Sequence, residues 1–452
     1  MPTLPHRDSR LAPGTPRILH LDVDAFLASV EIALHPELEG HPVIVGGPPT
    51  SRNLVMSCSY EARKAGVRPG MGLAEAARRC PQAVFRDGDS QAANRLREGA
   101  TRALLEFTPR VEVASIDDFF LDLTGSTRCL GAACDVAARI RRAVCERTAL
   151  PITVGIATNR MLARIAGKLA KPGGIGEILP GYEETFLTPL PVEHLPGVGH
   201  AIGARLERYA IRTVGELRLV AREILFASFG RDGLVLHERA RGRDPQRVEA
   251  THALDDDGRL VARAPRSIQR ETTFEPEEGR RELIEAMLSY LVERAAHRLR
   301  ASGLVAGSFQ VHLRYVDTRA RIVPGLADDA GLSATRRRVF PGPTDSTDEI
   351  WQHARALLAE LPRRRALVKR LGIALHDLSP AVGWQGRLFD GMDVPSPRAS
   401  RADRQRRLDR ALDRLRERLG FGRILRGSST PLQTTHPLRA DGFRMRTPSL
   451  NQ

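Results

Sequence analysis

The sequences RILHLDV at residues 17–23 and SIDDFFLDL at residues 115–123 decide the fold. Each is a short run of apolar and β-branched residues, which is typical of a buried strand. The first run carries an acid, Asp22, near its end, and the second begins with a pair of acids, Asp117 and Asp118. We therefore expect a site where acidic side chains from distant parts of the chain meet.

Three carboxylates in one partly buried site predict a bound cation. Adjacent carboxylates repel each other strongly unless a cation joins them. Asp22, Asp117 and Asp118 offer hard oxygen ligands, which suit Mg²⁺ completed by water and phosphate oxygens. Two such ions about 4 Å apart activate a hydroxyl nucleophile and stabilise a leaving pyrophosphate. An exposed acidic pair is also typical of a turn or a helix cap, so the metal site depends on the other motifs.

Side chains suited to phosphate lie in two further motifs. In SCSYEARKAGVRPGM, which starts at Ser57, Tyr60 and Arg63 are one helical turn apart and can face the same anion. In LAKPGG, Lys171 ends a helix and is followed by a proline and two glycines. A lysine and an arginine that converge on a triphosphate neutralise charge that develops in phosphoryl transfer. Taken singly, Tyr60 also fits core packing, and Lys171 fits a partner of a helix dipole.

Composition and charge narrow the class of protein. Of the 452 residues 42% are hydrophobic, enough for several buried cores, and no apolar run of about 18 residues predicts a membrane-spanning helix. Lys and Arg outnumber Asp and Glu by 69 to 54, and the net charge of +15 favours a nucleic-acid partner, although the codon usage of a GC-rich genome gives the same surplus. Five scattered cysteines lack zinc-ligand spacing, which indicates reduced thiols in the cytoplasm.

Two later segments favour contact with DNA. LPGVG at residues 195–199 joins two helical patterns. Gly197 and Gly199 leave backbone N–H groups open to phosphate, as in a helix-hairpin-helix. The alternative is a tight turn that binds no ligand. Residues 267–378 follow a βαββαβ order, which predicts a small sheet with two helices behind it. Within it, Arg336–Arg338 form a basic cluster that suits a DNA backbone or a solvated surface.

Taken together, these motifs resemble the Y family of translesion DNA polymerases, most closely the bacterial polymerase IV type. The resemblance covers about residues 16–378, and it is carried by LDVDAFLASVE, YEARKAGVRPGM, SIDDFFLDL, VGIATNRMLARIAGKLAKPGGI and LPGVG. It implies a multidomain α+β protein shaped as a right hand, with a mixed-sheet palm whose helices lie on one face, small fingers, a helix-hairpin-helix thumb and a βαββαβ little finger.

The resemblance also implies domain boundaries and residue roles. The domains are a flexible leader (1–15), the palm (16–25 and 92–178), the fingers (26–91), the thumb (179–251), a linker (252–266), the little finger (267–378) and a tail (379–452). The ligands of two Mg²⁺ ions, or of Mn²⁺, are Asp22, Asp117, Asp118 and the main-chain carbonyl of Val23. The nucleotide contacts are Phe26, Leu27, Ser57, Tyr60, Arg63 and Lys171. The partners are primer–template DNA and dNTPs.

Two positions depart from the family pattern. The family usually has Glu where this chain has Asp118, and losing one methylene shortens the reach by about 1.5 Å at a site where Mg²⁺ demands near-octahedral geometry. We expect activity with reduced affinity for Mg²⁺. The family usually has Tyr or Phe at Leu27, where the ring blocks a ribose 2′-hydroxyl. Leucine is smaller, so we expect ribonucleotides to be used, unless Phe26 rotates to take the place of the ring.

The tail contains QGRLF, with Gln385, Leu388 and Phe389 placed like the peptide by which bacterial polymerases bind the sliding clamp. Residues 402–419 alternate Arg and Asp around leucines, which predicts a charged amphipathic helix. We expect a monomeric, error-prone bacterial enzyme that is cytoplasmic and associated with the nucleoid. The alternatives are a catalytically weak scaffold that binds DNA and the clamp, and, far less well matched, a palm-domain nucleotide cyclase.

Overall fold

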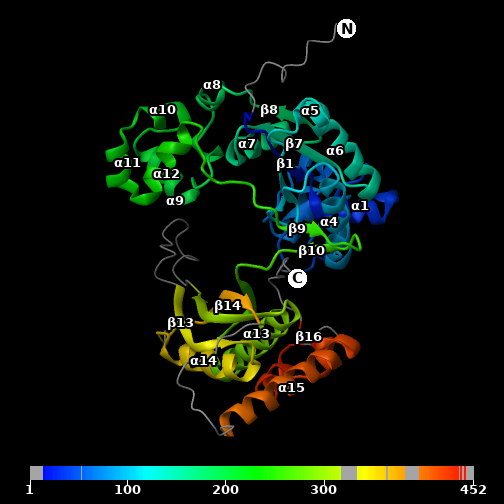
Figure 1. Cartoon of the computed structure of the whole chain (residues 1–452), viewed down its shortest axis with the longest axis vertical. Helices are drawn as coiled ribbons and strands as arrows, with labels where there is room; N and C mark the ends of the chain where they lie inside the picture. The colour runs from blue at the N-terminus through cyan, green and yellow to red at the C-terminus, as the bar shows by residue number, and fades with distance from the viewer. Residues whose placement is uncertain are drawn as a thin grey trace. The chain divides into compact units, whose positions relative to one another are not determined.

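The structure is a computed structural model that describes residues 14–51, 53–316, 333–362, 365–381, 397–436, 438–439 and 442–443. The chain divides into an N-terminal unit, Met1–Arg263, and a C-terminal unit, Ala264–Gln452, whose elements are labelled in Figure 1. Across the described ranges, no helix is both long and apolar enough to cross a membrane. The leader expected at residues 1–15 falls almost wholly outside these ranges.

The N-terminal unit is built on a five-stranded sheet with the order β5-β6-β1-β7-β8. Its strands are β1 (Ile18–Val23), β5 (Val111–Val113), β6 (Asp118–Asp122), β7 (Ile152–Ala157) and β8 (Ile175–Glu177). The central β1 is antiparallel to both β6 and β7, whereas β7 and β8 are parallel. The run SIDDFFLDL forms β6, and β5 precedes it as a separate strand, because the chain turns at 114–117 and Ala114 N–H bonds the Asp118 carbonyl.

Helices cover both faces of this sheet, so the expectation of helices on one face was wrong. The helices are α4 (Ser90–Leu105), α5 (Thr127–Leu130), α6 (Ala133–Thr148) and α7 (Arg160–Ala170). A Cβ on Gly155, the register partner of His20, would lie 1.9 Å from a carbonyl oxygen of α7, so α7 packs closely on the face that carries His20. Leu19 points to the other face and is fully buried beneath the paired helices α4 and α6.

A smaller α/β layer is inserted between β1 and α4. Its sheet has the order β3-β2-β4. Its elements are α1 (Phe26–Leu34), η2 (Pro36–Leu38), β2 (Val43–Val45), β3 (Ser57–Cys58), α2 (Tyr60–Lys64), α3 (Leu73–Arg79) and β4 (Val84–Arg86). The hydroxyl of Ser59 accepts a hydrogen bond from Ala62 N–H and caps α2, which fixes where Tyr60 and Arg63 stand.

A helical cluster follows β8 (green in Figure 1). Its helices are α8 (Glu183–Leu187), η3 (Val192–His194), α9 (His200–Arg208), α10 (Val214–Leu219), α11 (Arg222–Phe229) and α12 (Arg231–Ala240). Leu206, Leu225 and Leu236 share one buried core with Met161 and Leu162 of α7. The cluster is thereby joined to the central sheet through α7.

The segment expected as a linker, 252–266, folds in part into a β-hairpin of β9 (His252–Leu254) and β10 (Leu260–Ala262). Thr251 attaches this hairpin to β5, since its N–H bonds the Val111 carbonyl at 3.0 Å and its hydroxyl accepts from Val113 N–H at 2.8 Å.

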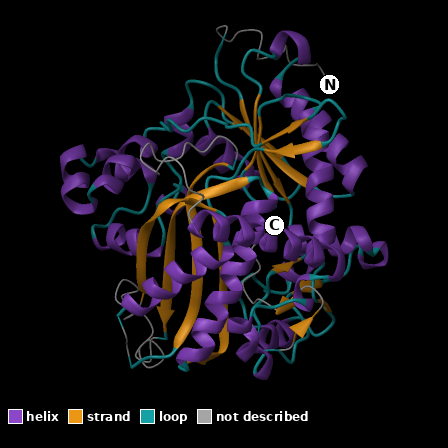
Figure 2. Cartoon of the chain, turned by 60° about the horizontal axis from the view of Figure 1, so that its bottom comes forward, coloured by secondary structure: helices purple, strands orange, loops and turns teal. Residues whose placement is uncertain are grey.

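The C-terminal unit confirms the predicted βαββαβ order. Its elements are β11 (Ile268–Glu278), α13 (Arg281–Ala301), β12 (Leu304–Tyr315), β13 (Ser333–Thr344), α14 (Thr347–Glu360) and β14 (Val368–Pro380). The antiparallel sheet has the order β11-β14-β12-β13, and α13 and α14 pack against one face of it, as Figure 2 shows. Phe309 and Leu313 of β12 lie in the core between the sheet and the helices.

The residues after β14 add a further layer on α13. They form α15 (Pro397–Leu419), η5 (Phe421–Arg423), η6 (Gly427–Thr434), β15 (Leu438–Arg439) and β16 (Gly442–Phe443). Arg416 of α15 is ion-paired with Glu293 of α13, and both side chains are buried. Phe443 N–H bonds the hydroxyl of Tyr290, which is also fully buried. The amphipathic helix predicted at 402–419 is present, and the C-terminal segment is part of the core of this unit.

Candidate active site

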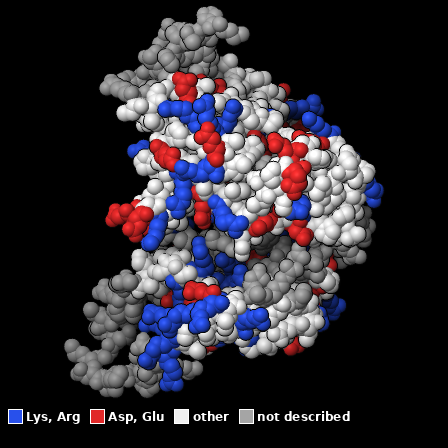
Figure 3. Space-filling model, turned by 90° about the vertical axis from the view of Figure 1, so that its right-hand side faces the viewer, with Lys and Arg blue, Asp and Glu red and all other residues white. Residues whose placement is uncertain are grey.

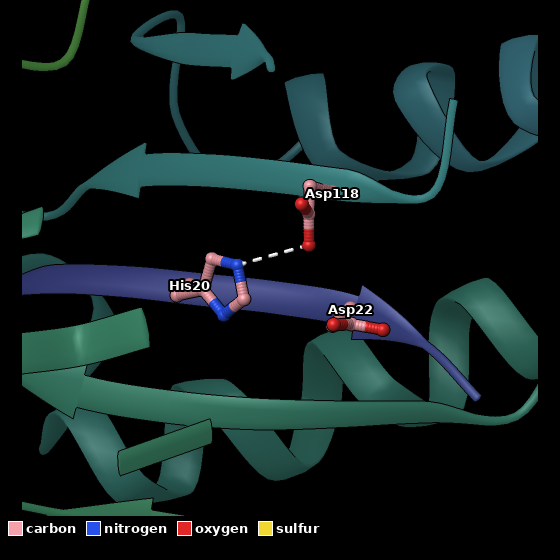
Figure 4. A group of neighbouring side chains, drawn as sticks. All are labelled: His20, Asp22 and Asp118. Atoms are coloured by element: carbon pink, nitrogen blue, oxygen red, sulfur yellow. Dashed lines mark hydrogen bonds and ion pairs between the residues drawn. The ribbon is translucent and has the colours of Figure 1, made fainter. Parts of the chain in front are cut away.

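Asp22 and Asp118 face each other across two antiparallel strands. They are register partners in β1 and β6, so their side chains leave the same face of the sheet. His20 lies two residues before Asp22 and therefore on the same face. Figure 4 shows the three side chains together, and one ligand atom from each lies within 4.8 Å of the others.

Two cationic side chains hold these carboxylates from α7 and the turn after it. The ammonium of Lys171 is bound to Asp22. Arg164 donates to Asp118 Oδ2 at 2.9 Å, while His20 Nε2 lies 3.1 Å from Asp118 Oδ1. The two oxygens of Asp118 thus have separate partners, and each carboxylate has one cation beside it.

Burial and neighbouring charge shift the pKa values of Asp22 and Asp118 in opposite directions. Burial raises the pKa of Asp22 to about 7, which Lys171 opposes and the charges of Asp118 and Asp117 reinforce. Burial acts to raise the pKa of Asp118 too, but the His20 hydrogen bond and Arg164 outweigh it, so that this pKa is lowered. Burial lowers the pKa of His20, so its imidazole is neutral and donates from Nε2 in the tautomer that makes this bond.

The donor set fits a divalent cation. Asp22 is costly to ionise beside another carboxylate unless positive charge is added, and Lys171 supplies one such charge in the free chain. Oxygens from Asp22 and Asp118 are the ligands that Mg²⁺ and Mn²⁺ prefer.

Asp117 lies in the turn before β6 and is not one of the three residues that converge within 4.8 Å. Its carboxylate accepts a hydrogen bond from the Ser115 hydroxyl at 2.5 Å. Its main-chain carbonyl bonds Val23 N–H at 3.0 Å, which ties the ends of β1 and β6 together. Asp117 is close enough to raise the pKa of Asp22 through its charge. The three acids predicted from the sequence therefore lie in one neighbourhood, with Asp22 and Asp118 closest.

Three of the residues predicted to bind phosphate lie together around α2. The guanidinium of Arg63 lies over the Tyr60 ring at 4.6 Å, and its Nε donates to the Cys58 carbonyl at 3.2 Å. The Ser57 hydroxyl donates to the Ala25 carbonyl at 3.1 Å and accepts from Ala28 N–H at 3.4 Å. Ser57 thus connects the strand before α2 to the start of α1.

The start of α1 carries the two remaining nucleotide-binding candidates. Its N-cap, Ala25, has a left-handed backbone (φ 47°) and supplies no side-chain cap. The first N–H groups of such a helix are open to an anion. Phe26 is buried, with 5% of its surface exposed, whereas Leu27 is half-buried and, like Tyr60, packs against the core of the inserted layer. Phe26 is therefore packed in the interior, whereas part of Leu27 stays accessible.

The sequence did not single out three residues of this site: His20, Asp24 and Arg164. A period of two along β1 places His20 beside Asp22, which is a usable signal. Asp24 follows the strand in the same motif, yet its partners come from three distant segments. Arg164 is one arginine among many on a helix, and only the fold reveals its ion pair with Asp118.

The residues predicted to contact DNA lie elsewhere. Gly197 has a left-handed backbone (φ 93°) and Gly199 is the N-cap of α9, so both lie in the turn before that helix. Arg336–Arg338 lie on the edge strand β13, where Arg337 is paired with Asp377 at 2.8 Å and Arg338 with Glu360 at 2.8 Å. On the face drawn in Figure 3, Lys and Arg side chains are interspersed with Asp and Glu. Gln385, Leu388 and Phe389 lie outside the described residues.

Comparison with protein families gives matches along most of the chain. Residues 21–168 match the impB/mucB/samB family, and residues 265–388 match the C-terminal domain of the same family. Residues 193–244 match the thumb domain described for DNA polymerase-iota. The matches include the central sheet, the helical cluster and the βαββαβ unit.

Similar sequences and solved structures point to the same family of proteins as the family matches. A DNA polymerase IV of Desulfatibacillum aliphaticivorans is 35% identical, with 90% of this chain and 95% of the relative aligned. A DNA polymerase IV of Halorhodospira halophila is 36% identical, over 80% of this chain and 96% of the relative. A chimeric Y-family DNA polymerase shares the fold with a TM-score of 0.65 at 23% identity, covering 80% of this chain and 99% of that one.

Proposed function

This chain belongs to the Y family of translesion DNA polymerases, and we propose that it adds nucleotides to a primer 3′ end by two-metal catalysis with Asp22, Asp117 and Asp118 as carboxylate ligands. The observation that carries the proposal is the cross-strand pairing of Asp22 with Asp118, two residues that are 96 positions apart in sequence yet register partners in the sheet. The carbonyl of Val23, between Asp22 and the turn into α1, completes the proposed ligand set.

Each carboxylate has a distinct task in this proposal. Asp118, held by His20 and Arg164, stays ionised and oriented. Asp22 is released from the Lys171 ammonium to bind a cation. Two Mg²⁺ ions, with Mn²⁺ as a substitute, would supply activation of the primer 3′-hydroxyl and stabilisation of the leaving pyrophosphate.

The triphosphate would lie between α1, α2 and Lys171. Arg63 offers a fork of N–H donors that suits phosphate, and the hydroxyls of Tyr60 and Ser57, which donate to Asp24 and to the Ala25 carbonyl in the free chain, would turn to phosphate oxygens. The N–H groups of Phe26 and Leu27 lie at the uncapped start of α1, where the helix dipole favours negative charge. Lys171 would exchange Asp22 for the phosphates.

Sugar selection would be weak. Leu27 stands where a ring is expected to block a 2′-hydroxyl, and the burial of Phe26 opposes its rotation into that place. We therefore propose that ribonucleotides are incorporated alongside deoxyribonucleotides. Small fingers that check base-pair shape loosely would make the enzyme error-prone and tolerant of damaged templates.

Binding of primer–template is assigned to two places. The turn with Gly197 and Gly199 would offer backbone N–H groups to phosphates without reading sequence. Arg336–Arg338 on β13 would contact the backbone, with the ion pairs of Arg337 and Arg338 exchanged for phosphates. We also propose that Gln385, Leu388 and Phe389 bind the sliding clamp and raise the local concentration of a monomeric enzyme on DNA in the bacterial cytoplasm, at the nucleoid.

A primer-extension assay tests this proposal. The wild-type chain and Asp117→Ala are compared on an undamaged and a lesion-containing template, with dNTPs or rNTPs, in Mg²⁺ or Mn²⁺. We expect extension by the wild type, including with rNTPs, and a loss of at least about a thousandfold in the variant with unchanged DNA affinity. Absence of extension by the wild type together with intact DNA binding would instead favour a scaffold that recruits other repair proteins.

A further inference from the structure

Asp24 is a buried carboxylate at the junction of three chain segments. It follows β1 immediately before α1, and only 2% of its surface is exposed. Its own N–H bonds the Pro151 carbonyl at 2.9 Å, and the Ser29 hydroxyl bonds its carbonyl at 2.5 Å, so its backbone is fixed on both sides. A buried carboxylate is costly unless donors satisfy its oxygens.

Three donors from separate elements converge on the Asp24 carboxylate. The Thr153 hydroxyl of β7 lies 3.0 and 2.9 Å from its two oxygens. Gly173 N–H, in the turn after α7, donates to Oδ2 at 2.8 Å. The Tyr60 hydroxyl of α2 donates to Oδ1 at 3.3 Å. The Lys171 ammonium lies 4.0 Å from the same oxygen, so the carboxylate is fully engaged by protein groups.

These partners belong to both sides of the proposed nucleotide site. Tyr60 belongs to the inserted α/β layer, whereas Lys171 and Gly173 belong to the turn that follows α7. Burial and the charge of Asp24 raise the pKa of Tyr60 to about 12, so its hydroxyl stays protonated and keeps its hydrogen bond to Asp24 until a phosphate oxygen competes for the proton. Asp24 is therefore the one side chain in the described part of the site that bonds both segments.

We propose that Asp24 is a positioning residue that holds Tyr60 and the Lys171 turn in the places from which they grip the triphosphate. The proposal rests on the proposed function, which assigns the triphosphate to Tyr60 and Lys171. Asp24 acts through these neighbours, and its side chain is not among the groups assigned to the nucleotide or to the metal ions. Its loss should weaken nucleotide binding and leave DNA binding unchanged.

Thr153 permits a test that leaves the nucleotide contacts untouched. It is buried, so Thr153→Val keeps the shape and removes the donor to Asp24, while Thr153→Ser keeps the donor. Each full-length variant is bound to primer–template ending in a dideoxynucleotide, and the dissociation constant of the next correct dNTP is measured by fluorescence. We expect binding about fivefold to tenfold weaker for Thr153→Val and within about twofold of wild type for Thr153→Ser.

A double-mutant cycle tests whether Asp24 acts on nucleotide binding through Tyr60. Asp24→Asn replaces one acceptor oxygen by an amide donor, which cannot accept from Tyr60 or Gly173. We expect Asp24→Asn to weaken dNTP binding at least about tenfold, and Tyr60→Phe to add little in that background although it weakens binding in the wild type. The proposal would be overturned if the losses of dNTP affinity caused by Asp24→Asn and Tyr60→Phe multiplied in the double variant. It would also be overturned if Asp24→Asn left dNTP binding unchanged, or weakened DNA binding as much as dNTP binding.

Failure of this inference can be told from failure of the proposed function. If Tyr60→Phe and Lys171→Gln weaken dNTP binding but Asp24→Asn and Thr153→Val do not, only the role of Asp24 is refuted. If neither Tyr60→Phe nor Lys171→Gln affects dNTP binding, the assignment of the triphosphate is wrong, and the role of Asp24 falls with it. Thermal unfolding of each variant checks that the chain remains folded.

Discussion

The ammonium of Lys171 is bound to the carboxylate of Asp22 at the end of β1. A lysine in that position neutralises the acid that the proposed mechanism needs for a cation, so the lysine and the cation compete. Because Lys171 is also the proposed triphosphate contact, nucleotide arrival gives its charge another partner. The ion pair therefore links nucleotide binding to the release of Asp22.

The first prediction concerns Lys171→Met. At pH 8.5, where Asp22 of the wild type is largely ionised with a pKa of about 7 beside Lys171, we expect Mn²⁺ to bind the nucleotide-free variant several-fold more tightly than wild type, because the competing ammonium is gone and the cation itself keeps Asp22 ionised. We expect dNTP binding to weaken at least about tenfold, because the triphosphate loses a cation. Electron paramagnetic resonance of free Mn²⁺ and a dNTP titration measure the two effects. The exposed Lys168, changed to Met, is the control. Weaker Mn²⁺ binding by Lys171→Met would contradict the competition.

The second prediction concerns sugar selection at Leu27. We expect Leu27→Tyr to raise the preference for dNTPs over rNTPs at least about tenfold, about 1.4 kcal/mol in the transition state, because a ring at this half-buried position would block the 2′-hydroxyl. Single-nucleotide insertion kinetics measure the ratio of kcat/KM values. Leu27→Ile, of similar volume, should remain permissive. Equal rejection of ribonucleotides by wild type and Leu27→Tyr would show that another residue, such as Phe26, excludes the 2′-hydroxyl.

The third prediction concerns the shortened acid. We expect Asp118→Glu to lower the Mg²⁺ concentration for half-maximal extension several-fold, since the longer arm carries the carboxylate about 1.5 Å further from β6. The same change lengthens the contacts with His20 and Arg164, so Asp118→Asn, which keeps the length but removes the charge, is the companion variant. Identical extension rates for wild type and Asp118→Glu across a magnesium titration would refute the expectation.

The sequence predicted those parts of the structure that depend on local patterns. The strand in RILHLDV and the βαββαβ order follow from local apolar patterns, so they were found. Asp24 was missed because its partners, Thr153 and Gly173, are more than a hundred residues away. In α15, alternating Arg and Asp indicated a solvated helix, yet Arg416 is buried against Glu293. A pattern of charge shows that ion pairs can form, but not which of them the fold will bury.

The fourth prediction concerns that buried pair. We expect Arg416→Met to destabilise the C-terminal unit by about 3–5 kcal/mol, because it leaves Glu293, which is fully buried, without its cation. The double variant Glu293→Gln/Arg416→Met should recover much of this loss, since no unpaired charge remains. Urea denaturation followed by circular dichroism measures the free energy of unfolding. Arg418→Met, an exposed position on the same helix, is the control and should differ from wild type by less than about 0.5 kcal/mol.

The fifth prediction is that protonation of Asp413 lowers the free energy of unfolding at acid pH. Burial acts to raise its pKa, but hydrogen bonds from His297 and Arg300 and their charge outweigh burial and lower the pKa to about 2. The ordinary value is near 3.9, so below about pH 4 the unfolded chain takes up a proton that the folded chain refuses. The stabilisation is therefore complete above about pH 5 and is lost as the pH falls through 4, by about 2 kcal/mol at pH 2.

The comparison that isolates this effect is wild type against Asp413→Asn. The neighbouring Asp409, whose pKa burial raises, is present in both chains; the charge of Asp413 is the smallest of the causes of this shift, so most of its contribution cancels in the difference. We expect the variant to be less stable at pH 6, because it loses the charge that pairs with Arg300 at 2.6 Å, and the gap to narrow by about 2 kcal/mol by pH 2.5. Free energies of unfolding from urea titrations at four pH values measure the gap. A gap that is constant from pH 6 to pH 2.5 would mean that Asp413 titrates alike in the folded and unfolded chain, and that its contacts with α13 contribute nothing to stability.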